Sequence, residues 1–73
     1  MREERELIMM KMQKHALSYV WLINRLERQG ILTEKSEMSS VVRGTRRGPK
    51  AEQIIKTALK ILGEYEAAMG QCS

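Results

Sequence analysis

A chain of 73 residues allows one small domain and leaves no room for a catalytic cleft between two layers. An apolar content of 42% is enough for one compact core, and the abundance of Leu, Ile, Met, Ala, Glu, Lys and Arg indicates an all-helical fold rather than disorder. The formal net charge of +4 fits either a nucleic-acid partner or a solvated basic loop, so charge alone does not choose between them.

The chain offers few groups for catalysis or metal binding. It contains no aspartate, one histidine (His15) and one cysteine (Cys72), which excludes an internal disulfide. No metal-ligand spacing and no glycine-rich phosphate loop is present. We therefore expect no enzymatic activity, metal, cofactor or small-molecule substrate. The lack of a signal-peptide pattern and of a long apolar run predicts a cytoplasmic protein without a membrane partner.

The first predicted helix spans Arg2 to His15, with its acids in the first turns and its lysines near the end, an order that suits the helix dipole. Its apolar side chains follow helical spacing and are expected to form a wide face toward the core: Leu7, Ile8, Met9, Met10 and Met12. His15 has no second ligand nearby and is expected at the helix end or on the surface.

Ser18 predicts the N-cap of a second helix from Tyr19 to Arg28, and Gly30 is expected to close it in the left-handed conformation. Four residues at helical spacing are expected to be buried at least in part: Tyr19, Leu22, Ile23 and Leu26. Trp21, the only tryptophan, is predicted to pack in the fold or in a dimer contact.

The stretch from Gly30 to Gly44 predicts a short third helix that begins at Thr33 or Glu34 and ends at Arg43. Its apolar residues, Met38, Val41 and Val42, recur at helical spacing. The side chains between them are mostly small or basic. A helix with one buried face and one short, polar, basic-edged face fits the major groove of DNA.

A basic turn follows, because Arg43, Arg46, Arg47 and Lys50 fall within eight residues that contain no acid. Pro49 predicts the first position of a fourth helix, and Gly63 is expected to end it. We accordingly divide the chain into a domain of residues 1–63 and a tail of residues 64–73, which forms either a helical extension or a frayed end. Tyr65 and Met69 of this tail are candidates for contact with a second subunit.

The order of these elements resembles the lambda-repressor/Cro-like (XRE-type) helix-turn-helix family of small phage and mobile-element regulators. The resemblance covers Ser18 to Leu62 and rests on the run Trp21-Leu22-Ile23 early in the second helix and on Lys35-Ser36-Glu37-Met38-Ser39-Ser40-Val41-Val42-Arg43-Gly44. Arg43 stands where the family usually has asparagine. The resemblance implies an all-α bundle of four helices, or five if the tail forms its own, which binds double-stranded DNA as a homodimer and represses transcription in the bacterial cytoplasm, at the nucleoid when bound.

By position in such a domain, the exposed side of the third helix supplies the base contacts, namely Lys35, Ser36, Ser39 and Ser40. The phosphate contacts are expected from Tyr19, Arg43, Thr45, Arg46, Arg47 and Lys50. Glu37 is expected either to accept from a cytosine amino group or to repel wrongly placed phosphate.

Two alternatives remain open. Small phage-type proteins of this architecture also act as protein-binding modules on a repressor or RNA polymerase, and the methionine-rich first helix with Val20 and Trp21 offers such a surface. That function leaves the basic turn without a role. RNA binding is the other alternative, but the chain lacks the exposed aromatic residues on which single-stranded bases stack.

Overall fold

Four helices make up the part of the chain that the computed structural model describes, which is residues 2–72 with side chains through residue 70. They are α1 (Arg2–Lys14), α2 (Tyr19–Arg28), α3 (Lys35–Arg43) and α4 (Pro49–Cys72). The described residues contain no strand. The predicted all-α bundle of four helices is therefore confirmed. The side chain of Cys72 lies outside the described residues.

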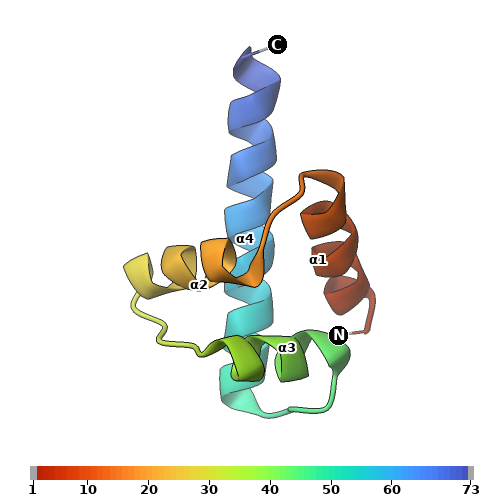
Figure 1. The fold of residues 1–73 in the computed structure, drawn as a ribbon, viewed down its shortest axis with the longest axis vertical. Helices are drawn as coiled ribbons and strands as arrows, with labels where there is room; N and C mark the ends of the chain where they lie inside the picture. The colour runs from red at the N-terminus through yellow and green to blue at the C-terminus, as the bar shows by residue number, and fades with distance from the viewer. Residues whose placement is uncertain (1, 73) are drawn as a thin grey trace.

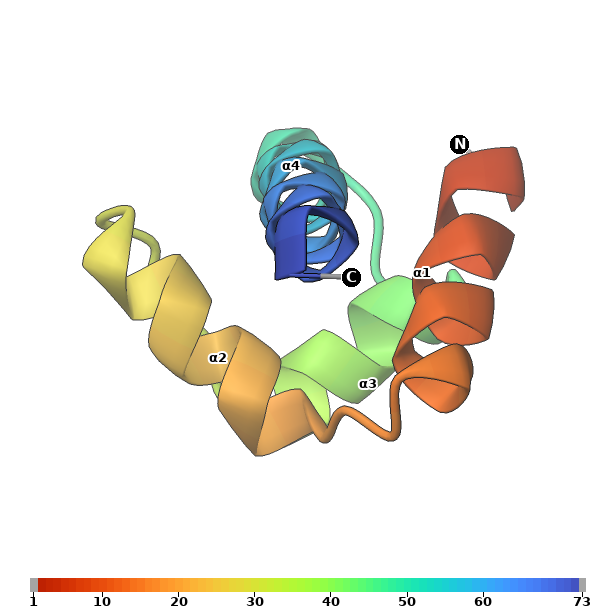
Figure 2. The same cartoon turned by 90° about the horizontal axis from the view of Figure 1, so that it is seen from above.

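Helix α4 forms the long axis of the molecule. Its 24 residues, at about 1.5 Å of rise each, account for the longest extent of 37 Å. The other three helices gather around the N-terminal part of α4, while its C-terminal turns project beyond them (Figure 1). Seen from above, α2, α3 and α1 form an arc along one side of α4 (Figure 2). Both α1 and α2 therefore pack on α3 and on α4.

The core lies where this arc meets α4. Each helix contributes buried side chains at helical spacing, and the α2–α3 link adds one: Ile8, Met12, Leu22, Leu26, Ile31, Met38, Val41, Val42, Ala51, Ile54, Ile55, Ala58, Ile61 and Leu62. Helices as short as α2 and α3 are marginal on their own. Burying each large aliphatic side chain contributes about 1.5–3 kcal/mol, so packing rather than helix propensity holds them in place.

Local signals set the ends of α2 and α3 as predicted. The Ser18 hydroxyl accepts a hydrogen bond from the Trp21 amide at 3.2 Å, which caps the start of α2. Gly30 and Gly44 follow the two helices with φ of +85° and +87°, where a side chain would be strained. The entry residue of α3 is Glu34 rather than Thr33, and its side chain makes no capping hydrogen bond.

The predicted wide apolar face of α1 is wrong. Only Ile8 and Met12 are buried, whereas Leu7, Met9 and Met10 are 39%, 45% and 57% exposed. The reason is the position of α1 at one end of the arc, where it meets only α3 and α4 and buries a single narrow stripe (Figure 2).

The prediction that Gly63 ends the last helix is also wrong, because α4 continues to Cys72. Contacts within the chain hold this extension. Tyr65 meets the rings of His15 and Trp21 edge to face, each with centroids 5.3 Å apart, and so packs on its own chain. His15 directly follows the end of α1, which is one of the two places expected for it, and its side chain is 11% exposed beside Glu66.

Candidate nucleic-acid interface

The face of α3 that points away from the core carries Ser36, Ser40 and Arg43. These residues recur every three or four positions and therefore share one side of the helix. Ser36 and Arg43 are exposed, Ser40 is half-buried, and Met38 and Val41 are buried on the opposite side. Of the other predicted base contacts, Lys35 is exposed in the first turn and Ser39 is half-buried on the flank.

The turn after α3 is fastened to the last turn of that helix through one carbonyl. Ser40 O accepts from the amides of Gly44, Thr45 and Arg46 at 3.0 to 3.3 Å, and from the Thr45 hydroxyl at 3.1 Å. The basic turn is thus held at a fixed position beside the outward face of α3. The Thr45 hydroxyl proton is occupied in this arrangement, so a phosphate contact from Thr45 would have to break the bond to Ser40.

Glu37 holds two of the predicted phosphate-binding cations. Its two carboxylate oxygens accept from Arg46 Nη1 at 2.6 Å and from Lys50 Nζ at 3.3 Å. The Glu37 side chain is only 12% exposed beneath these cations, which are themselves more than half exposed. Desolvation raises the pKa of Glu37, but the hydrogen bonds from Lys50 and Arg46 outweigh it and leave this pKa below its ordinary value. The trio therefore carries one net positive charge rather than two.

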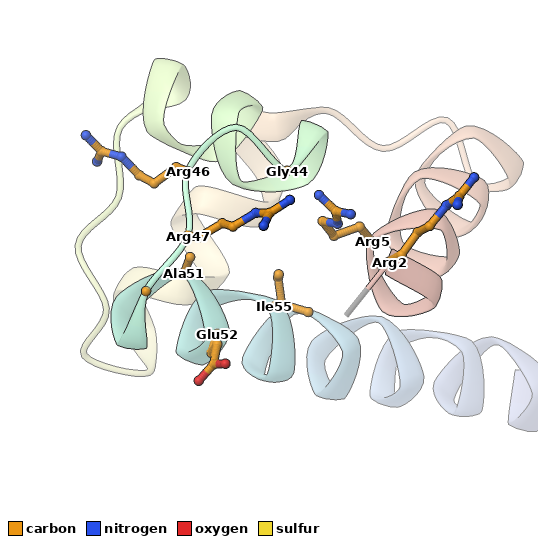
Figure 3. A pocket seen from close by; sticks show the side chains of 9 residues that line it. Arg2, Arg5, Gly44, Arg46, Arg47, Ala51, Glu52 and Ile55 are labelled. Carbon is orange, nitrogen blue, oxygen red and sulfur yellow. The ribbon is translucent and has the colours of Figure 1, made fainter.

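Arg47 takes a different direction from Arg46. Its guanidinium points along α4 toward α1, whereas Arg46 points away on the other side of the turn (Figure 3). Arg47 makes no hydrogen bond or ion pair within the described chain. From α1, Arg5 reaches toward Gly44, where a Cβ would overlap its guanidinium group. The Nε of Arg5 is buried and has no acceptor among the described residues, a condition that costs free energy on the order of 1–3 kcal/mol or more for a charged group.

Tyr19 does not join this cluster. It is half-buried against the core and lines a hollow with Met12, Gln13 and Leu17 beside the α1–α2 link. The remaining predicted phosphate contacts, Arg43, Arg46, Arg47 and Lys50, are exposed at the end of α3 and in the turn. The structure thus brings together the exposed face of α3 and the basic turn, and leaves Tyr19 outside them.

Sequence reasoning missed the part that α1 plays at this turn. Arg2 and Arg5 lie three residues apart and line a hollow with Arg46 and Arg47. Their spacing places both on one side of α1, which is the only sequence signal, and nothing in the local pattern indicates that this side meets the end of α3. The bridge from Glu37 to Arg46 and Lys50 was missed for the same reason, because it joins two helices.

No protein-family model, no curated protein and no solved structure matches this chain. None of the described helices has the length and apolar character of a membrane span. Within residues 2–72, no three His, Cys, Asp or Glu side chains gather as metal ligands. The function of this chain must therefore be inferred from the geometry of α3 and its basic turn.

Proposed function

We propose that the protein binds double-stranded DNA with the outward face of α3 in the major groove, and that it regulates transcription as a helix-turn-helix repressor. The observation that carries this proposal is the composition of α3. Met38, Val41 and Val42 are buried on one side of the helix. Apart from Glu37 at the edge, the other side presents small or cationic side chains beside an exposed basic turn.

The size of this face suits the groove. An α-helix with side chains is about 10–12 Å across, and the major groove of B-DNA is about 12 Å wide. Serines at positions 36 and 40 keep the outward face low, so the helix backbone approaches the base edges closely. In this arrangement Lys35 donates to guanine O6 or N7, and the serine hydroxyls donate to or accept from base edges.

The basic turn supplies the phosphate contacts in this proposal. Arg43 extends from the last turn of α3, and Arg47 follows in the turn without an internal acid partner among the described residues. Arg46 and Lys50 are shared with Glu37, so they contribute less to counterion release than two free cations. One such unit reads a half-site, and we extend the proposal to a homodimer on a two-fold site with half-sites about 34 Å apart.

The test is a set of DNA titrations by fluorescence anisotropy at several salt concentrations, with duplexes from the DNA that flanks the gene and with a scrambled duplex. Lys35→Ala and Arg43→Ala are compared with Lys56→Ala and Lys60→Ala, which remove the same charge from the exposed far side of α4. We expect Arg43→Ala to reduce the slope of log K against log salt by about one, and Lys35→Ala to weaken binding to the flanking duplex most. Equal losses in all four variants would contradict binding through α3.

A second candidate function is a protein-binding module. It is favoured by the exposed side chains of Leu7, Met9 and Met10 on α1 and of Val20 on α2. Binding of the folded chain to RNA polymerase or a repressor, lost on Met9→Ser/Met10→Ser substitution and accompanied by no duplex binding at low salt, would establish it in place of DNA binding.

A further inference from the structure

A second cationic feature lies where α1 meets the α3–α4 turn. We call it the arginine hollow, a space of about 440 Å³ lined by Arg2, Arg5, Gly44, Arg46, Arg47, Gly48, Ala51, Glu52 and Ile55. Ala51 and Ile55 rise into it from α4 and form an apolar floor (Figure 3). Its one acid, Glu52, points away on the far side of α4, and Arg46 is bound to Glu37 (Figure 3).

Arg2 pairs with Glu6 at 3.4 Å, so the guanidinium groups of Arg5 and Arg47 remain without an acid partner among the described residues. These two groups point toward one another from opposite walls (Figure 3). Neither makes an ion pair or hydrogen bond within the described chain, and the buried Nε of Arg5 lacks an acceptor. The two like charges repel each other, and Arg5 is in addition half-buried while Arg47 is exposed. An anion between them would relieve the repulsion and supply an acceptor to Arg5.

The dipole of α3 is a simpler reason for a cation at this place, because Gly44 marks its C-terminal end. It does not explain the pair. The terminal carbonyls of Ser40 and Val41 already accept backbone amides from the turn, and the dipole of one short helix favours one cation rather than two. It also leaves the Arg5 Nε donor unused.

We propose that Arg5 and Arg47 form a binding site for a phosphate group. A phosphate presents several acceptor oxygens, and two guanidinium groups offer paired N–H donors that match them. The same oxyanion can come from the backbone of a nucleic acid or from free phosphate. The site stands without the DNA-binding proposal, because inorganic phosphate alone tests it.

The absence of a side chain at Gly44 is part of this site. An added Cβ would overlap the Arg5 guanidinium, so that group must leave its place. Gly30 offers a matched control, because its φ of +85° is close to the +87° of Gly44 and nothing lies within 4 Å of its added Cβ. Gly44→Ala and Gly30→Ala therefore share the backbone strain, and only the first displaces Arg5.

The experiment follows the ¹⁵N–¹H signals of the Arg5 Nε and the Gly44 amide by NMR during titration with sodium phosphate, against sodium chloride at equal ionic strength. We expect saturable shifts with phosphate alone. Arg5→Gln and Arg47→Gln are expected to weaken binding by about tenfold or more each, as for the loss of a charge-assisted hydrogen bond. Arg28→Gln, which removes an equal charge from the exposed end of α2, is expected to change little.

The glycine variants give the second readout. Gly44→Ala is expected to lose phosphate binding and Gly30→Ala to retain it, with circular dichroism showing that both remain helical. No saturable shift in the wild type, or an equal loss in Arg5→Gln and Arg28→Gln, would overturn the site.

A duplex titration of Arg5→Gln then identifies the source of the phosphate. A salt slope smaller by about one assigns it to a nucleic-acid backbone, and an unchanged slope assigns it to free phosphate. Phosphate binding without any duplex binding would contradict the DNA proposal and leave the phosphate site of Arg5 and Arg47 intact. Duplex binding through α3 without phosphate shifts would overturn the phosphate site and leave the DNA proposal intact.

Discussion

Glu37 determines how much positive charge the surface of α3 presents. Its carboxylate lies under Arg46 and Lys50 and accepts from both, on the edge of a helix whose other exposed side chains are small or cationic. For a DNA-binding surface such an acid has two effects. It fixes the two cations in place, and it cancels one of their charges.

Replacing Glu37 by Gln is expected to raise the affinity for any duplex and to steepen the salt dependence by about one unit, because the one positive charge that Glu37 cancels becomes available to displace counterions. The matched control is Glu34→Gln, which removes the same charge at the start of α3, where no ion pair is present among the described residues. Stability should fall by no more than about 1 kcal/mol, since the partners are largely exposed. Equal gains in duplex affinity for the two variants would show that the effect comes from net charge alone and not from the pairs with Arg46 and Lys50.

At the scale of the helices, Gly63 shows how tertiary contacts overrule a local signal. It lies in the middle of α4, is exposed, and has nothing within 4 Å of an added Cβ. The helix continues through it because Tyr65 and Glu66, on the next turn, are fastened to α1 and α2.

Gly63→Ala should therefore stabilise the protein by about 0.5–1 kcal/mol, because alanine loses less backbone entropy than glycine in a helix. For a domain of this size that corresponds to a rise in melting temperature of roughly 2–8 °C. Thermal unfolding followed by circular dichroism measures it, with Gly30→Ala as the contrasting variant that lowers the melting temperature. A lower melting temperature for Gly63→Ala would mean that α4 breaks at this position.

The elements that the sequence predicted well are those specified by neighbouring residues. Ser18, Gly30, Gly44 and Pro49 mark helix ends through local hydrogen bonds and backbone conformation, and the structure confirms these four signals. The exposed polar face of α3 followed from helical spacing in the same way. What could not be predicted depends on the packing of distant segments, such as the width of the buried stripe on α1 and the approach of Arg5 to Gly44.

At the scale of the whole molecule, the C-terminal half of α4 is tied to the end of α1. Glu66 accepts from Lys11 and, at 2.9 Å, pairs with His15. Hydrogen bonds from Lys11 first and His15 second lower the pKa of Glu66 to about 2. Because the folded state holds this carboxyl ionised, its contribution to stability is present above the ordinary pKa of 4.5 and is lost as the pH falls toward 2.

Glu66→Gln is expected to lower the free energy of unfolding at pH 7 and to make it fall less steeply than in the wild type between pH 4.5 and 2. Urea unfolding at several pH values measures this difference, which should shrink toward acid. Glu64→Gln, two residues earlier and exposed, is the control and should follow the wild-type pH dependence. Parallel curves for the wild type and Glu66→Gln would show that the tie contributes nothing.

The measurement that tests DNA binding through α3 most directly is chemical-shift mapping of the ¹⁵N-labelled chain with a duplex at moderate salt. The proposal predicts that the amides of Lys35, Ser36, Ser40 and Arg43 and those of the basic turn shift together, while Lys56 and Lys60 on the far side of α4 stay unchanged. Shifts centred on Lys56 and Lys60, or a folded chain that responds to no duplex, would contradict it.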